Sequence, residues 1–175
     1  MRTITQCRAC GSGELVDVLN LGLQHLSEFR EDASQPPKYP LQLVFCTGCT
    51  LAQLRDTVPP ELLYHDSYSF KSGISPAVGA DLADVVAYTL AHRPNPERWL
   101  DIASNDGTLL GYVPVETYRV GIDPLAQFAH EARQHADEVI VDFFSPEHFW
   151  GGPRFDVITS VSMFYDLDDP NRFVG

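Results

Sequence analysis

Four cysteines have the residue type and the spacing of metal ligands. They form two pairs, Cys7-Arg-Ala-Cys10 and Cys46-Thr-Gly-Cys49. A Cys-x-x-Cys turn directs two thiolates at one point, and two such turns close a tetrahedral zinc site. Glycines beside or within the pairs (Gly11, Gly13 and Gly48) would supply positive φ angles and let backbone N–H groups approach the sulfurs. Because four thiolates leave no open position for water, the pattern predicts a structural zinc at Cys7, Cys10, Cys46 and Cys49.

Three alternative roles fit the cysteines less well than zinc binding. A disulfide framework belongs to secreted proteins, and the opening residues Met1-Arg-Thr-Ile lack the apolar core of a signal peptide. A thioredoxin-like site would need a single Cys-x-x-Cys pair in a different setting. Unligated buried cysteines would rarely form two matched pairs. The same opening residues predict a cytoplasmic protein.

A second group of residues has the arrangement of an adenosine-cofactor site. The apolar run Trp99-Leu-Asp-Ile102 leads into the loop Ala103-Ser-Asn-Asp-Gly107, and a further run, Tyr118-Arg-Val-Gly-Ile122, ends in Asp123. Strand, tight loop, helix, strand and acid is the order in which an α/β sheet holds the ribose of such a cofactor. After a third apolar run, Asp142 and Phe143 could hold the edge and the face of the adenine.

The loop distinguishes between two cofactors. A dinucleotide pyrophosphate needs bare glycine backbone and no competing anion at the helix N-terminus. Here Ala103 and Asn105 occupy the first two glycine positions, and Asp106 adds a negative charge. S-adenosylmethionine carries a sulfonium and an amino group, which tolerate that acid. The loop therefore favours S-adenosylmethionine over NAD, and a Rossmann-like sheet without any cofactor is the further alternative.

These sites need elements that hold them in place. A helix should begin at Ser75 and end by residues 93–96, because apolar residues recur at helical spacing after Pro76. Strands at 98–102, 118–122, 138–144 and 155–161 alternate with helices expected from Leu109 and over 124–135, which predicts a parallel, doubly wound α/β sheet. Residues 41–45 should form a strand entering the second cysteine pair, after a proline-rich loop over 31–40. We expect a β-rich zinc module over 1–57, a connector over 58–74, and a cofactor-binding half-domain over 75–175.

The connector gathers aromatic, hydroxyl and lysine side chains. One interpretation is a short helix and loop that pack the zinc module onto the next domain. The other is a cap over a substrate pocket, in which Tyr64 and Tyr68 contact the substrate while Lys71 or Ser72 meets a carboxylate. The residue types alone favour neither.

The composition excludes several function classes. Hydrophobic residues make up 44% of the 175, which allows a packed core, and 24 acids against 12 Lys plus Arg give a net charge of −12. No basic footprint for nucleic acid is visible, and no apolar run reaches the roughly 20 residues of a membrane helix. We expect neither nucleic acid nor membrane as a partner.

Taken together, the paired cysteines, the aromatic connector and the segments LDIASNDGTLL, GIDP and FDVITSVSMFYDLDDP resemble the zinc-containing sugar C-methyltransferases. That family acts on nucleotide-linked 4-keto-deoxysugars in antibiotic and surface-sugar pathways. The resemblance covers essentially the whole chain in the same order. It implies zinc at the four cysteines, a substrate pocket near Tyr68, a class I methyltransferase sheet, and cofactor contacts at Asp101, Ala103, Ser104, Asn105, Asp106, Gly107, Asp123, Pro124, Asp142, Phe143 and Ser160.

The reaction that the resemblance implies passes through a sugar enolate. A base removes the proton beside the ketone, and the enolate carbon then attacks the sulfonium methyl. The family sheet has seven strands and a catalytic base in a C-terminal region, whereas four strands are visible before Gly175. We therefore expect a truncated chain with its base beyond Gly175, which binds the cofactor without methylating alone. The histidines that could substitute for the base are interpreted as surface residues: His65, His130, His135 and His148.

Three other functions stay open at this level. The chain could methylate an oxygen or nitrogen of a small metabolite, serve as a non-catalytic zinc-ribbon adaptor, or act as an NAD-dependent nucleotide-sugar oxidoreductase. An incomplete sheet would also leave an apolar strand edge exposed, which predicts self-association through that edge.

Overall fold

The computed structural model describes residues 1–26 and 36–175 and divides the chain into two compact units. The first unit contains residues 1–68 and 164–175, and the second contains residues 69–163. The chain therefore leaves the first unit after Tyr68 and returns to it at Phe164. Among the residues that the structure describes, no helix is both long and apolar enough to span a membrane.

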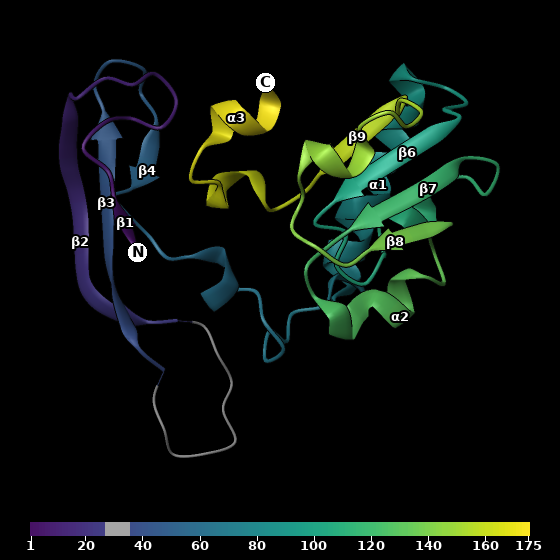
Figure 1. Cartoon of the computed structure of the whole chain (residues 1–175), viewed down its shortest axis with the longest axis horizontal. Helices are drawn as coiled ribbons and strands as arrows, with labels where there is room; N and C mark the ends of the chain where they lie inside the picture. Colours follow the sequence, from purple (N-terminus) through teal and green to yellow (C-terminus); the bar gives the residue numbers. More distant parts are fainter. Residues whose placement is uncertain (27–35) are drawn as a thin grey trace. The chain divides into compact units, whose positions relative to one another are not determined.

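The first unit is β-rich, as predicted (Figure 1). Strand β2 (Leu15–His25) pairs antiparallel with β3 (Lys38–Cys46), and β3 pairs with β4 (Ala52–Leu54). A two-stranded sheet joins β1 (Arg2–Thr3) to β5 (Asp56–Thr57). The 3-10 helices η1 (Pro60–Leu62) and η6 (Phe164–Asp166) and the short helix α3 (Pro170–Val174) complete the unit. The strand that enters the second cysteine pair is thus confirmed.

The second unit is a parallel four-stranded sheet with helices, which confirms the predicted α/β class. Strands β6 (Arg98–Ile102), β7 (Tyr118–Ile122), β8 (Glu138–Ile140) and β9 (Val157–Ser160) lie in the order β8-β7-β6-β9. Pairing is parallel throughout. The carboxyl ends of all four strands therefore meet at one edge of the sheet. Strand β9 forms one lateral edge, where Ile158 is 59% exposed.

Helix α1 (Pro76–His92) covers one face of this sheet, and Figure 1 shows it behind the strands. The Ser75 side chain accepts a hydrogen bond from the N–H of Val78, and Pro76 occupies the first helical position, as the sequence predicted. Leu82 and Val86 on its buried side pack with Trp99, Leu109, Leu110, Val113 and Val157. The core of the second unit is therefore built by a helix that precedes the first strand of the sheet.

Several predicted elements are wrong in length. The helix expected from Leu109 is only the 3-10 helix η3 (Leu110–Tyr112), because Gly111 and Pro114 disfavour its continuation. The helix expected over 124–135 shrinks to η4 (Ala126–Phe128) and α2 (Ala129–Ala132). The remaining short 3-10 helices are η2 (Ser72–Ile74) and η5 (Pro146–Phe149).

The lengths of β8 and β9 are set by the residues available for pairing on the neighbouring strands, and not by the lengths of the apolar runs in the sequence. β8 ends at Ile140 because its partner Ile122 is the last residue of β7, and β9 spans only the length paired with Trp99–Ile102 of β6. Conversely, the predicted loop over 31–40 is partly wrong, because Lys38, Tyr39 and Pro40 pair with β2. Residues 31–35 of that loop lie outside the described residues.

A buried polar seam crosses the core between β6 and β9. The Trp99 Nε1–H donates to Thr159 Oγ1 (3.0 Å), and the Thr159 hydroxyl donates to Asp101 Oδ1 (2.7 Å). Burial raises the pKa of Asp101 to about 7; the hydrogen bond from Thr159 opposes this shift and the negative charge of Asp123 adds to it. Asp101 therefore keeps its proton to a higher pH than an ordinary aspartate does.

Leu110→Ala should destabilise the second unit strongly, because Leu110 is fully buried in the core beneath α1. Comparable Leu→Ala changes lower the free energy of unfolding by about 2–5 kcal/mol. Urea unfolding followed by tryptophan fluorescence measures this unit, since both tryptophans lie within residues 69–163. Leu23→Ala on the exposed side of β2 is the control and should change the same transition by less than about 0.5 kcal/mol. Equal effects of the two substitutions would contradict the described core.

Asp101→Asn should make stability less dependent on pH. A carboxyl whose folded pKa is raised from 3.8 to about 7 stabilises the fold fully below its unfolded pKa, and this contribution is lost as pH rises to about 7. The variant keeps the acceptor for Thr159 but lacks the proton. Its free energy of unfolding relative to wild type should increase between about pH 5 and pH 8 in the same fluorescence assay. A difference that stays constant over that interval would show that Asp101 keeps an ordinary pKa.

Candidate functional site

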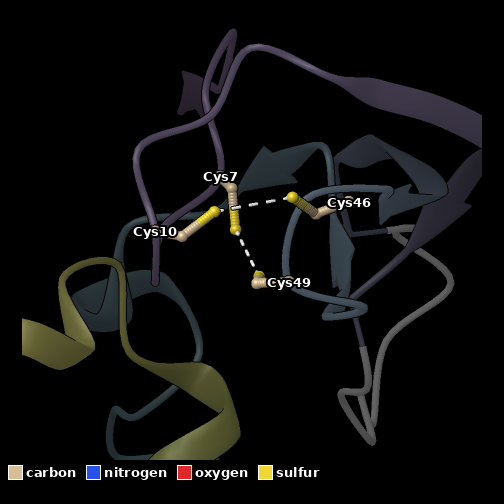
Figure 2. Close-up of side chains that lie close together, drawn as sticks. All are labelled: Cys7, Cys10, Cys46 and Cys49. Atoms are coloured by element: carbon tan, nitrogen blue, oxygen red, sulfur yellow. Dashed lines mark hydrogen bonds between the residues drawn. The ribbon is translucent and has the colours of Figure 1, made fainter.

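The four cysteines converge on one point, as Figure 2 shows. Their Sγ atoms all lie within 4.8 Å of one another, with 3.6 Å between Cys7 and Cys49 and 3.6 Å between Cys10 and Cys46. None of the four forms a disulfide. Tetrahedral zinc with Zn–S bonds of about 2.3 Å separates its sulfurs by about 3.8 Å. The donor set and its spacing therefore fit a metal ion of this kind.

The two Cys-x-x-Cys turns repeat one backbone pattern. The N–H of Gly11 donates to the carbonyl of Cys7 (3.0 Å), and the N–H of Thr50 donates to the carbonyl of Cys46 (2.8 Å). Both donors have positive φ, 73° at Gly11 and 65° at Thr50. The expectation for Gly11 is thus confirmed, whereas Gly13 and Gly48 do not have positive φ. At Gly48 the backbone instead passes close to other atoms, because an added Cβ would lie 3.4 Å from Ser12 and 3.7 Å from Cys46 Sγ.

Hydrogen bonds stabilise a thiolate at Cys7. Burial by itself raises the pKa of this thiol, but N–H groups of Cys10 and Ala9 and the side chain of Gln53 lower it to about 6. The Gln53 Nε2 atom lies 3.1 Å from Cys7 Sγ. At Cys49 the N–H of Leu51 lowers the pKa, but the thiols of Cys10 and Cys7 outweigh it and raise the pKa to about 12. Crowding of this kind opposes four thiolates without a cation.

The cofactor loop follows β6 and carries unusual backbone angles. Ala103, Asn105 and Gly107 have φ of 61°, 51° and 80°. Left-handed backbone is unfavourable for alanine by about 1–2 kcal/mol, and such outliers cluster at functional sites. Gly107 is required by space as well, because an added Cβ would lie 2.8 Å from Ala132 Cα. The Ser104 side chain is buried, and its Oγ has no hydrogen-bond partner among the described residues.

Asp123 holds this loop at the end of β7. Its Oδ2 accepts from the N–H of Asn105 and its Oδ1 from the N–H of Leu125, both at 2.9 Å. Burial raises the pKa of Asp123, these two N–H groups lower it, and the charge of Asp106 adds to the rise. The structure therefore places Asp123 beside the loop of β6, and its contact with the ribose of a cofactor stays a prediction.

Asp106 already has hydrogen bonds on both carboxylate oxygens. Oδ2 accepts from the N–H of Gly73 (2.9 Å), and Oδ1 accepts from the hydroxyl (2.6 Å) and N–H (3.2 Å) of Thr108. The N–H of Ser72 donates to Asn105 Oδ1 (3.0 Å), and the Asn105 amide donates to the carbonyl of Phe70 (3.1 Å). Asp106 and Asn105 thus bind the 70–73 segment to the loop. Contact between Asp106 and a cofactor stays a prediction.

The predicted substrate residues divide between the two units. Lys71 and Ser72 belong to the second unit, where Lys71 pairs with Glu131 and lies over the ring of Phe128. Tyr64 and Tyr68 belong to the first, with ring centroids 5.4 Å apart. The Tyr64 hydroxyl donates to Asp166 (2.6 Å). The structure does not bring these four residues together within one unit, and their role at a substrate stays a prediction.

The other predicted cofactor residues lie at the same strand edge. Asp142 is exposed two residues after β8, and its carboxylate bonds to the N–H of Phe143 (2.8 Å) and to Nε2 of His148 (3.2 Å). His148 also contacts Ser145 through Nδ1, so both of its ring nitrogens are occupied. Ser160 is the last residue of β9. Pro124, Phe143 and Ser160 are half-buried.

Sequence reasoning missed several residues that support these sites. They are partners contributed from distant positions: Gln53 to Cys7, Thr159 to Asp101, Gly73 to Asp106 and Glu131 to Lys71. No local motif marks them, because each is defined by strand register or by chain packing. For Gln53 alone the sequence offers a weak signal, because side chains alternate between the two faces of a strand and Gln53 is the buried residue of β4.

Comparisons with known proteins bear on both units. Residues 7–64 match the Methyltransf_13 family model, described as "Putative zinc binding domain". That match includes all four cysteines. The chain is also 25% identical over 154 residues to the C-methyltransferase NovU of Streptomyces niveus, which covers 84% of this chain and 36% of that relative. The chain therefore spans about a third of the length of this relative.

Solved structures of methyltransferases also resemble part of the chain. The plantazolicin methyltransferase BpumL in complex with SAH is 21% identical over 53% of this chain and 37% of its own, with a TM-score of 0.40. The related BamL complex is 19% identical, covers 55% and 38%, and has a TM-score of 0.43. CalS10, an amino pentose methyltransferase from Micromonospora echinaspora bound to SAM, is 22% identical, covers 56% and 44%, and has a TM-score of 0.39.

Four clustered cysteines lie in the part that matches the zinc-binding domain, and the NovU match extends over most of the chain. The chain therefore carries a segment that matches the zinc-binding domain of C-methyltransferases and is a distant homologue of NovU.

Proposed function

We propose that this chain binds S-adenosylmethionine and forms part of a C-methyltransferase that acts on a nucleotide-linked keto-deoxysugar. The observation that carries the proposal is the match to one C-methyltransferase over 84% of the chain, which extends well beyond the cysteine module. The loop and acid at the ends of β6 and β7 support a cofactor at that edge.

In this proposal the ends of the strands hold the cofactor. Asp123 accepts hydrogen bonds from the ribose hydroxyls with lone pairs that the N–H groups of Asn105 and Leu125 leave free. Asp142 and Phe143 meet the adenine from the end of β8. Asp101 is buried in the core and accepts a hydrogen bond from Thr159, so it links β6 to β9. The cofactor supplies a methyl group on a positively charged sulfur.

The reaction needs a carbanion equivalent beside a ketone and a methyl group held in line with it. Holding both reactants in that alignment contributes much of the rate in a bimolecular transfer. In this chain Asn105 and Asp106 fix the 70–73 segment to the cofactor loop. We assign no described residue as the base that forms the enolate.

Zinc at the four cysteines has a structural role in this proposal. Four thiolate ligands leave no position for water or substrate, so the ion cannot act as a Lewis acid on the sugar. It stabilises a β-rich unit whose longest strand exposes apolar residues such as Val18, Leu21 and Leu23. A unit of this size needs support beyond its hydrophobic core.

The proposed function is tested in two steps. Calorimetric titration should detect binding of S-adenosylhomocysteine and no binding of NAD. Incubation with S-adenosylmethionine and a nucleotide-linked 4-keto-deoxysugar, analysed by mass spectrometry and NMR, should then give no methylated sugar with this chain alone, because none of its described residues is assigned as the base. Methyl transfer to carbon by this chain would overturn that expectation while supporting C-methylation, and a methyl group on oxygen or nitrogen would contradict C-methylation. NAD binding in place of S-adenosylhomocysteine contradicts the cofactor.

Asp123→Asn should weaken cofactor binding. The substitution removes a charged acceptor and turns an NH₂ group toward the N–H of Asn105 or Leu125. Hydrogen bonds to charged groups contribute about 1.5–3 kcal/mol, so the Kd for S-adenosylhomocysteine should rise about 10- to 100-fold. Asp81→Asn, which removes an exposed carboxylate of α1, is the matched control and should leave the Kd unchanged. Equal Kd values for wild type and Asp123→Asn would exclude Asp123 from the cofactor site.

A further inference from the structure

The segment 164–175 lies against the first cysteine turn, although it is more than 150 residues away in sequence. It belongs to the same compact unit as residues 1–68. Inside the segment, the ring of Phe164 packs edge-on against Phe173, with centroids 5.9 Å apart. Asp169 caps α3 by accepting a hydrogen bond from the N–H of Arg172 (3.0 Å). The segment is thus folded and docked, and Figure 2 shows its ribbon beside Cys10.

Asn171 makes the most specific contacts of this docking. Its side-chain amide donates to the carbonyl oxygens of Arg8 (3.1 Å) and Ala9 (2.9 Å), the two residues between Cys7 and Cys10. These carbonyls belong to the peptide groups whose N–H ends, at Ala9 and Cys10, bond to Cys7 Sγ. Because a peptide group is planar, fixing its C=O also fixes the direction of its N–H. Asn171 therefore orients both N–H groups that meet the sulfur.

Asp168 fastens the same segment through Arg8. The Arg8 side chain is only 10% exposed, and its Nε lies 3.6 Å from Asp168 Oδ1. Asp168 also pairs with Arg2 and accepts a hydrogen bond from the Thr57 hydroxyl (3.3 Å). The N–H of Arg8 donates to Gln53 Oε1 (3.1 Å), while Gln53 Nε2 donates to Cys7 Sγ (3.1 Å). Loss of Asp168 would leave the nearly buried Arg8 side chain without this carboxylate.

We propose that Asn171 and Asp168 hold the turn between Cys7 and Cys10 in the shape that binds the metal, Asn171 through the carbonyls of Arg8 and Ala9 and Asp168 through the Arg8 guanidinium, so that metal retention and docking of segment 164–175 depend on each other. Partners that orient metal ligands commonly change metal affinity 10- to 100-fold when they are removed. The proposal rests on a metal ion at the four cysteines. It adds that segment 164–175, which follows β9 in the sequence, helps to retain this ion. The bound ion in turn keeps segment 164–175 docked on the cysteine turn.

The first experiment measures zinc transfer from the full chain to a colorimetric chelator. Asn171→Asp removes the amide donor and places a carboxylate opposite the two carbonyls, so transfer should be about 10- to 100-fold faster than in wild type. Asp168→Asn should also accelerate transfer. Asn20→Asp is the matched control, because it adds the same charge in the same unit on β2 while keeping the acceptor for the N–H of Gly22. Its transfer rate should equal that of wild type.

The second experiment needs no variant. Hydrogen exchange of wild-type chain, with zinc and after its removal, should show faster exchange in 164–175 once the metal is lost. Unchanged exchange in that segment would overturn the coupling, and so would transfer from Asn171→Asp at the wild-type rate. Wild-type chain that binds no metal would overturn the zinc site and this inference with it, whereas the proposed function fails separately, in the titration with S-adenosylhomocysteine.

Discussion

Four thiol groups within 4.8 Å of one another are the constraint on which the first unit depends. Thiolates at this distance repel. Hydrogen bonds lower the pKa of Cys7, whereas the neighbouring thiols of Cys10 and Cys7 raise the pKa of Cys49, so the four groups do not all ionise readily together. A divalent ion neutralises the thiolate charges. Its bonds to the four sulfurs then cross-link the turn at residues 7–10 to the turn after β3. Strands β1 to β5 and the segment 164–175 then have a fixed point to pack around. The N–H groups, Gln53 and Asn171 complete the surroundings of that point.

The second unit is stabilised differently. Its sheet packs against α1 through a core centred on Trp99 and Leu110. Its strain is concentrated at the carboxyl edge, where Ala103 and Asn105 have left-handed backbone and where Asp101, Asp106 and Asp123 are buried. Hydrogen bonds from backbone N–H groups and from Thr159 compensate these carboxylates. The same edge is where the ends of parallel strands meet a ligand in α/β folds.

The sequence predicted features that depend on local pattern. The cysteine spacing led to the cluster, the apolar runs led to the parallel strands, and Ser75-Pro76 led to the start of α1. Features set by distant partners were missed or wrong. The register with Ile122 shortened β8, and the second positive φ falls on Thr50 where a glycine was expected. Asn171 lies in a segment with no recognisable motif, so only folding reveals that it contacts the turn between Cys7 and Cys10.

The most direct test of this account is the metal content and metal coordination of the purified full chain. Elemental analysis combined with X-ray absorption should give one zinc per chain, bound by four sulfurs at about 2.3 Å. A chain without metal, cysteines joined as disulfides, or a zinc shell containing nitrogen or oxygen ligands would contradict the account.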